Sequence, residues 1–390
     1  MRERVKCHTC DRRKMPGVGS DFAYRCRGGV PEFEFRRGVS ALPSEDAHAS
    51  FVRFSVDVYL AVLCESVFFL SCVAMPLDPR AKNLLEMLNR IEAPRLEDQP
   101  VAFARRNFEK LMFAYRPDAP AIGSAQDLLI ARKDFAGGPL PARLYRPQGH
   151  TGSLPALLWL HGGGWTLGDL ASYDTFCRSL CAEAQCAILA LDYRLAPENR
   201  FPAALDDTWW TLRWLMREAA SMKLDATRVA IGGDSAGGNL AAVACHMLRS
   251  STGDARDIRL QLLVYPTTDQ TSQRASHEKY GEGHFLDRAS INWFQHNYLP
   301  AESDYFDWRA SPLLAMDFTG LPPALIITAE CDPLTDDAHA YADKLAAARV
   351  PVRYSEYAGM IHGFVTMGRI LPDAARAITE MADALREAFR

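Results

Sequence analysis

The sequence predicts an α/β protein with a mostly parallel central sheet flanked by helices. After Leu140, short apolar runs alternate with amphipathic stretches, which is the pattern of a parallel sheet covered by helices. The 390 residues, 48 % of them hydrophobic, allow one large core with an inserted cap, or two domains at most. One catalytic domain with appendages is the simplest interpretation.

Seven apolar runs are expected to form the strands: 142–147, 156–161, 187–193, 228–233, 260–266, 324–330 and 352–357. Helices are expected between them, including 204–218 and 236–250. Two segments interrupt this alternation. Residues 79–125 precede the first of these strands, and residues 268–308 are too long and polar for a plain crossover. We expect these two segments to form a helical cap over the site.

The first 74 residues differ from the body. Residues 1–50 mix Arg, Gly, Pro and Glu without periodicity, so we expect disorder there, and we interpret the Cys7–Cys10 pair as a chance C-x-x-C. The apolar run 51–74 contains two carboxylates, which disfavour a membrane span. Three interpretations stay open for it: an extension with no role in catalysis, an anchoring or export segment, and an extra packed helix.

The sequence from Met75 onward is typical of the start of a compact enzyme, with Leu84, Leu85 and Leu88 on one face of a predicted helix. We therefore expect residues 1–74 to be an N-terminal extension and residues 75–390 to form the catalytic unit. Membrane contact is expected only if residues 51–74 act as an anchor.

Charge and cysteine content exclude several classes of function. The net charge is −4 and no long Lys/Arg block is present, so nucleic acid is not an expected partner. Ten cysteines are too sparse for a disulfide scaffold in a chain of this length. We expect reduced cysteines, a cytoplasmic protein, and neither metal nor cofactor.

The central motif is Gly233-Asp234-Ser235-Ala236-Gly237, a G-x-S-x-G between a predicted strand and a predicted helix. A serine on such a turn has a strained backbone that small neighbours tolerate, and its hydroxyl stands clear of the sheet. The following helix directs its positive end at the reacting oxygen. Ser235 is thus the candidate nucleophile.

A second motif, His161-Gly162-Gly163-Gly164-Trp165, follows the apolar run ALLWL. Successive glycines allow close approach of the backbone and direct amide N–H groups at one point. In an acyl-transfer enzyme that point is the oxyanion of a tetrahedral intermediate. The alternative is a flexible turn.

The candidate acid and base follow two later strands. Asp332 and His362 both lie just beyond the carboxyl ends of predicted strands, and the chain order Ser, Asp, His is that of one class of hydrolases. Asp336 and Asp337 are nearby, but the first turn of a helix favours carboxylates and explains them. Among the other histidines, His246 is expected to be structural, and His284 and His296 fall in the expected cap. His362 is followed by glycine and is preferred as the base.

Taken together, these motifs resemble those of the hormone-sensitive-lipase-like esterases, or bacterial lipolytic family IV, of the α/β-hydrolase superfamily. The resemblance runs from about Met75 to the C-terminus and includes HGGGW, DYRLAPE (192–198), GDSAGGNLA (233–241), DPL (332–334) and HGF (362–364). It implies the catalytic residues Ser235, His362 and Asp332, and an oxyanion hole from the amides of Gly163, Gly164 and Ala236. It also implies that His161 shapes the glycine loop, with Gly162 and Asp234 in support, and that residues 192–198 brace the site.

The expected function is hydrolysis of short- to medium-chain acyl esters by a Ser-His-Asp triad through an acyl-enzyme, with a small-molecule ester as substrate. Because the base must be neutral, activity is expected to fall below about pH 6.5. Trp165, Trp293 and Phe294 are candidate pocket residues, although simple packing also explains such aromatics. A homodimer is plausible for the family. The rival functions are a non-catalytic small-molecule binder and an acylaminoacyl-type peptidase.

Overall fold

The computed structural model describes residues 22–27, 30–35, 77–90, 94–132, 138–252 and 257–390. The chain divides into two units, Met1–Ala74 and Met75–Arg390.

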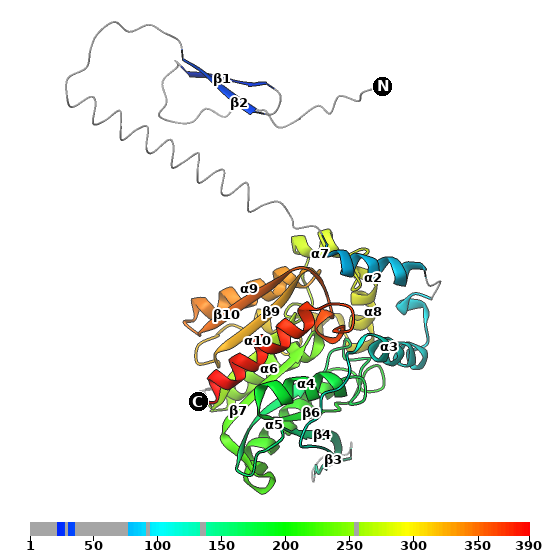
Figure 1. The fold of residues 1–390 in the computed structure, drawn as a ribbon, viewed down its shortest axis with the longest axis vertical. Coiled ribbons are helices and arrows are strands. Elements are labelled where there is room, and N and C mark those ends of the chain that lie inside the picture. Colours follow the sequence, from blue (N-terminus) through cyan, green and yellow to red (C-terminus); the bar gives the residue numbers. More distant parts are fainter. Residues whose placement is uncertain (1–21, 28–29, 36–76, 91–93, 133–137, 253–256) are drawn as a thin grey trace, which may run out of the picture. The chain divides into compact units, whose positions relative to one another are not determined.

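An eight-stranded sheet forms the centre of the unit Met75–Arg390 (Figure 1). Its strand order is β10-β9-β8-β7-β5-β6-β4-β3, parallel from β10 to β6, with β4 antiparallel to β6 and β3 antiparallel to β4. The strands are β3 Ser124–Ile130, β4 Leu140–Arg146, β5 Leu154–Leu160, β6 Ala187–Leu191, β7 Leu224–Asp234, β8 Ile258–Val264, β9 Ala324–Cys331 and β10 Val352–Ile361. The predicted α/β class with a mostly parallel sheet is confirmed.

The seven predicted strands correspond to β4 through β10, and β3 is the strand that the sequence analysis missed. It lies at the edge of the sheet, where Ile130 is buried but Leu129 is 71 % exposed. An edge strand with little burial lacks the continuous apolar run by which the central strands were recognised.

Helices cover both faces of this sheet. They are α2 Pro79–Arg90, α3 Val101–Tyr115, α4 Asp174–Ala184, α5 Ala203–Glu218, α6 Ala236–Thr252, α7 Ala275–Tyr280, α8 Arg288–Tyr298, α9 Thr335–Ala347 and α10 Asp373–Ala388. Short 3-10 helices add η1 Leu96–Asp98, η2 Ala219–Met222, η3 Glu302–Phe306, η4 Pro312–Leu314 and η5 Phe364–Thr366. The expected helices 204–218 and 236–250 correspond to α5 and α6.

Alternating side chains on each strand explain the two layers. On β5, Leu158 and Leu160 pack in a cluster with residues of α5, α6 and α9. Leu157 and Trp159 point to the opposite face and pack in a cluster with residues of α2, α4 and α10. The five cysteines of the described body are free and buried, and they pack as small apolar side chains.

The two segments expected to form the cap contain different kinds of element. Residues 79–125 hold α2, η1 and α3, and residues 268–308 hold α7, α8 and η3. The segments meet where η1 packs against α8. Helix α2 buries Leu84 and Leu85 in the cluster formed with α4 and α10, so this helix belongs to the core layer.

The unit Met1–Ala74 contains an antiparallel pair of strands, β1 Phe22–Arg27 and β2 Val30–Phe35. The expectation of disorder throughout residues 1–50 is wrong for this pair. The sequence signal was Gly28-Gly29 between two alternating runs, which is typical of a hairpin. Cys7, Cys10 and the apolar run 51–74 lie outside the described residues. Within the described part of the chain, no helix has the length and apolar character needed to cross a membrane.

Candidate active site

The candidate residues converge because four strands end at the same edge of the sheet. Leu160, the last residue of β5, pairs with Gly233 of β7, so the glycine loop and the serine turn begin side by side. Asp332 follows β9 directly and His362 follows β10 directly. This is the edge at which open α/β sheets bind ligands.

The turn at Ser235 has the strained backbone that the motif predicted. Ser235 adopts a φ of +55°, in the left-handed region, between β7 and α6. Its N–H donates to the carbonyl of Val264, 2.9 Å away, which fixes the turn to β8. A Cβ at Gly233 or Gly237 would overlap the carbonyl oxygen of Leu160. Only glycine therefore fits on either side of the turn.

Ser235, His362 and Asp332 form a continuous hydrogen-bonded chain. His362 Nε2 lies 3.0 Å from Ser235 Oγ, and His362 Nδ1 lies 2.6 Å from Asp332 Oδ2. Asp332 is fully buried and His362 is 7 % exposed. Because a carboxylate only accepts, Nδ1 carries the proton toward Asp332, which leaves Nε2 free to accept from the serine hydroxyl.

Asp332 has its own support, and the neighbouring aspartates have separate partners. The second oxygen of Asp332 accepts the N–H of Leu334 at 2.9 Å. Asp337 is buried and accepts from Ser272 Oγ and from His277 Nε2 at 2.8 Å. The sequence predicts Asp337 in the first turn of a helix. That placement is correct, but the carboxylate also joins α9 to residues 272–277 of the connection before α8.

The remaining histidines named above have other partners or are exposed. His246 is buried on α6 with Nε2 3.1 Å from Tyr341 Oη, as expected of a structural residue. His284 Nδ1 lies 2.7 Å from the carbonyl oxygen of Glu282. His296 is exposed on α8.

The glycine loop has an unusual backbone at three consecutive positions. Gly163, Gly164 and Trp165 have φ values of +108°, +58° and +56°. The carbonyl of Gly163 accepts the N–H groups of Thr166 and Leu167 at 3.1 and 2.8 Å, which closes the turn. Among the described residues, no hydrogen bond uses the N–H of Gly163 or Gly164 as donor. These two amides can therefore donate to a bound oxygen.

Asp234 joins the glycine loop to the serine turn. Its carboxylate accepts the N–H of Gly162 and the hydroxyl of Tyr173, each at 2.8 Å, and the Gly162 N–H also lies 3.1 Å from Tyr173 Oη. Burial raises the pKa of Asp234 to about 6, against the opposing effects of these hydrogen bonds and of His362. Tyr173 was missed in the sequence because it lies outside every motif, and no local pattern marks it.

His161 supports the loop by packing and not by charge. Its ring stacks on Tyr193 with centroids 4.3 Å apart, and its Nδ1 lies 2.7 Å from the carbonyl oxygen of Gly162. Burial lowers the pKa of His161 to about 4, so the ring is neutral near pH 7. The hydroxyl of Tyr193 donates to the carbonyl of His161 at 2.8 Å.

The three aromatic candidates for the pocket occupy different environments. Trp165 is 2 % exposed and stacks on Tyr298 at 4.3 Å, so it has almost no free surface for a ligand, and packing explains it. Phe294 of α8 lies directly against Gly164, where a Cβ would overlap its ring. Trp293 is half-buried beside Phe294.

Two aromatic neighbours of His362 were also missed. The ring of Tyr265, which follows β8, lies 4.5 Å from the His362 ring between centroids. Phe285 lies against Gly363, next to His362. Both contacts join residues far apart in the sequence, and neither residue belongs to a motif that the sequence analysis used.

The segment 192–198 contacts the glycine loop directly, since the N–H of Ala196 donates to the carbonyl of Trp165 at 2.8 Å. The Arg105 guanidinium pairs with Glu198 at 2.7 Å and donates to the carbonyls of Thr166 and Ala196, each at 2.9 Å. Arg194 pairs with the buried carboxylate of Asp207 at 2.8 Å. The segment is thus joined both to the loop and to α5.

Comparisons with known proteins agree with this geometry. The sequence profile of the α/β hydrolase fold family matches residues 157–366. An ethyl acetate hydrolase of Pseudomonas putida is 40 % identical over 288 residues, which cover 73 % of this chain and 89 % of that protein. The carboxylic ester hydrolase LipN of Mycobacterium tuberculosis is 44 % identical over 255 residues, covering 64 % of this chain and 67 % of LipN.

Solved structures give the same result. An ester hydrolase from the metagenome of Lake Arreo, in complex with a bipyridine phosphonate derivative, has a TM-score of 0.77 at 39 % identity. It covers 80 % of this chain and 99 % of its own. A hyperthermophilic esterase from Pyrobaculum calidifontis has a TM-score of 0.75 at 35 % identity, with the same coverage. The chain therefore belongs to the α/β hydrolase family, among the hormone-sensitive-lipase-like esterases that its motifs resemble.

Proposed function

We propose that the protein is a carboxylesterase that hydrolyses short- to medium-chain acyl esters, with Ser235 as nucleophile, His362 as base and Asp332 as the orienting acid. The observation that carries the proposal is the hydrogen-bonded chain from Ser235 to Asp332, which begins on a strained turn at the ligand-binding edge of the sheet. The ester hydrolases described above supply the substrate class.

In the first half of the reaction, Ser235 Oγ attacks the acyl carbonyl while His362 Nε2 takes the hydroxyl proton. The resulting imidazolium is stabilised by the buried carboxylate of Asp332. Collapse of the tetrahedral intermediate breaks the bond to the alcohol oxygen, which receives the proton from His362. Water then attacks the acyl-enzyme by the same route and releases the acid.

The oxyanion of each intermediate would accept hydrogen bonds from the amides of Gly163, Gly164 and Ala236. The first two have no other acceptor among the described residues, and Ala236 is the first residue of α6, whose positive end favours negative charge. One such donor contributes about 3 kcal/mol to transition-state stabilisation. Asp234, Gly162 and His161 would keep the glycine loop in place.

We further propose that α3 and α8, from the segments 79–125 and 268–308, cover the site. Phe294 supports this because it lies against the glycine loop, and Trp293 lies beside it. Such walls would limit the length of the acyl or alcohol group. Residues 1–74 are proposed to have no part in the chemistry. A homodimer, membrane contact through residues 51–74 and a cytoplasmic location remain predictions.

Hydrolysis of p-nitrophenyl esters from acetate to palmitate tests the proposal. We expect fast cleavage of the short esters, slow cleavage of palmitate, and a loss of several orders of magnitude in kcat for Ser235→Ala. Retained turnover in that folded variant would require another nucleophile, and no turnover in folded wild-type protein would favour the binder. An acyl ester compared with the matching anilide separates an esterase from a peptidase.

A further inference from the structure

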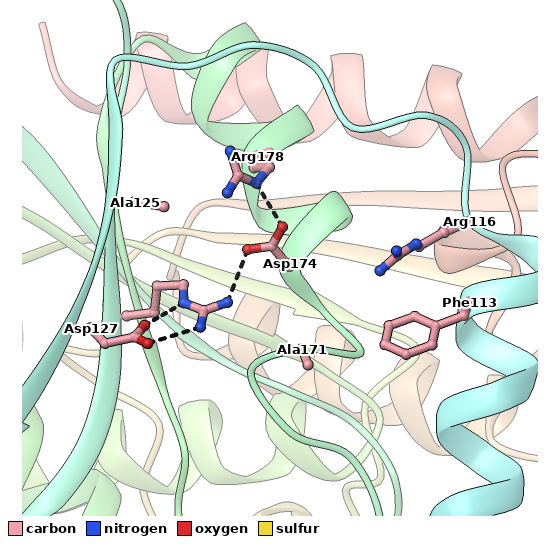
Figure 2. A pocket seen from close by; sticks show the side chains of 8 residues that line it. Phe113, Arg116, Ala125, Asp127, Ala171, Asp174 and Arg178 are labelled. Carbon is pink, nitrogen blue, oxygen red and sulfur yellow. Dashed lines mark hydrogen bonds and ion pairs between the residues drawn. The ribbon is translucent and has the colours of Figure 1, made fainter.

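Arg116, which follows the last residue of α3, lines two hollows. The first has a volume of about 420 Å³ and is lined by charged residues of β3, β4 and α4 (Figure 2). The second has a volume of about 120 Å³ and lies among α4, α10 and η5. Arg116 lines both of them, and none of their lining residues belongs to the proposed triad.

Charges in the first hollow are paired except for Arg116. Asp127 pairs with Arg143 at 2.5 Å, and Asp174 pairs with Arg143 at 3.1 Å and Arg178 at 2.6 Å. Among the described residues, no carboxylate lies within ion-pair distance of the Arg116 guanidinium, which lies 4.2 Å from the centroid of the Phe113 ring. Figure 2 shows the Arg116 nitrogen atoms directed toward the hollow. Within the first hollow, three guanidinium groups face two carboxylates, which leaves the charge of Arg116 for a ligand.

The second hollow has a mainly apolar wall that also includes the buried hydroxyl residues Ser172, Thr175 and Thr366. Phe176, Val365 and Ile378 supply apolar surface. Ser172 is 3 % exposed, and its Oγ has no hydrogen-bond partner among the described residues. A buried hydroxyl without a partner is unfavourable unless a ligand satisfies it. Glu183 also lines this hollow, but it lies in the last turn of α4, whereas Ser172 precedes the first residue of this helix.

We propose that these two hollows, which share Arg116, bind a short-chain carboxylate, with its carboxylate at Arg116 and Ser172 and its chain between α4 and α10. The positive charge of Arg116 favours an anion, and the apolar wall of the second hollow favours a hydrocarbon chain. The small volume of the second hollow limits the length of that chain. A monocarboxylate of this kind is the class of acid that ester hydrolysis releases, and only that link to the product rests on the proposed function. The site itself rests on Arg116, Ser172 and the groove.

Butyrate is the probe. The active site is blocked before the titration so that butyrate bound there does not add to the measured signal. Full-length protein is treated with a p-nitrophenyl phosphonate, in which Ser235 Oγ bonds to phosphorus, p-nitrophenolate leaves and His362 takes the serine proton. Ligand-observed NMR titration then measures butyrate binding to the blocked protein. We expect saturable binding with a Kd in the millimolar range, as suits so few ligand atoms.

Arg116→Gln should raise this Kd about tenfold or more, because a charge-assisted hydrogen bond is lost. The matched control is Arg106→Gln, an exposed arginine on the same helix that lines neither hollow, and it should leave the Kd unchanged. A second variant, Ala375→Phe, fills the groove from an exposed position on α10 and should also abolish binding. The uncharged analogue 1-butanol should show no saturable binding.

Equal butyrate affinity in wild type and Arg116→Gln, or no binding to the wild type, would overturn the site. A separate observation tests the proposed function: if phosphonate treatment releases no p-nitrophenolate, the proposed function is contradicted. In that case the titration is carried out on the Ser235→Ala protein, where the same comparison of variants decides the site.

Discussion

The two loops that meet at the active site are held in place by different forces. The serine turn, residues 233–237, is fixed by steric fit, since Gly233 and Gly237 leave no room between β7, α6 and the carbonyl of Leu160. The glycine loop, residues 161–165, is fixed by polar contacts from Asp234 and Tyr173. The stacking of its own His161 ring on Tyr193 also holds it.

Because of this difference, mutations are expected to displace the nucleophile and the proposed oxyanion donors by different routes. A steric anchor tolerates no added atom, and its loss affects the folding of the whole sheet. A polar anchor tolerates conservative changes, and its loss moves two amides while the core stays packed. Substitutions of Gly233 or Gly237, which flank the serine turn, should therefore change mainly stability. Substitutions of the residues that hold the glycine loop should change mainly kcat.

The largest effect is expected at Gly237. In Gly237→Ala the new Cβ overlaps the carbonyl oxygen of Leu160, so the free energy of unfolding should fall by about 3 kcal/mol or more. Urea unfolding measures it. Gly152→Ala is the matched control, since a Cβ there meets nothing within 4 Å. A stable and active Gly237→Ala protein would contradict steric anchoring.

Gly163→Ala should reverse the balance between stability and activity. Its φ of +108° is strained for alanine, and a Cβ would overlap the Leu167 carbonyl, so the loop must move. We expect kcat for p-nitrophenyl acetate to fall about 100-fold, which is the loss typical of one oxyanion donor. The free energy of unfolding should fall less than it does in Gly237→Ala. If the variant loses as much stability as Gly237→Ala but retains the wild-type kcat, the proposed contrast is wrong.

Asp234→Asn should lower kcat about tenfold, because the amide cannot accept from both Gly162 and Tyr173. Steady-state kinetics with p-nitrophenyl acetate measure this change.

The pH dependence of stability is a second test of Asp234. The folded-state pKa of about 6 exceeds the unfolded value near 4, so folded wild-type protein binds more protons between these pH values and loses stability as pH rises through them. Stability of the variant relative to wild type should therefore rise by up to about 3 kcal/mol from pH 4 to pH 6 and then stay level.

The matched control for this pH trend is Asp225→Asn, the second residue of β7, whose carboxylate is partly exposed. Hydrogen bonds from Thr227 and Arg228 lower the pKa of Asp225 to about 2, so its contribution to stability is lost only below about pH 4. Urea unfolding at pH 4, 5, 6 and 8 compares the two variants. A flat difference for Asp234→Asn would show that its carboxylate is not desolvated as described.

The smallest effect is expected for Tyr173→Phe. The ring stays packed against Phe176, while one hydrogen bond to Asp234 is lost. This loss should lower the free energy of unfolding by about 1 to 2 kcal/mol. We expect a few-fold fall in kcat with little change in KM. A KM effect larger than the kcat effect, in steady-state kinetics, would place Tyr173 with substrate binding and not with the loop.

The sequence predicted those features that local pattern determines. The strands β4 to β10 follow from their buried apolar runs, and Ser235, Asp332 and His362 follow from their positions after predicted strands. Features that depend on contacts between distant residues were not predictable. Tyr173 contacts Asp234 across 61 residues, and the Asp337 carboxylate reaches His277 across 60. The edge strand β3 carries too little burial to leave a recognisable pattern.

The order of the active-site groups along the chain has a practical consequence for fragments. Ser235 lies 127 residues before His362, and Asp332 lies 30 residues before it, so the proposed triad is assembled only when β7, β9 and β10 share one sheet. A chain cleaved between α6 and β9 leaves the nucleophile in one piece and the base in the other. Such a pair would serve as a reporter of association, because ester cleavage would return only when the two pieces rebuild the common sheet.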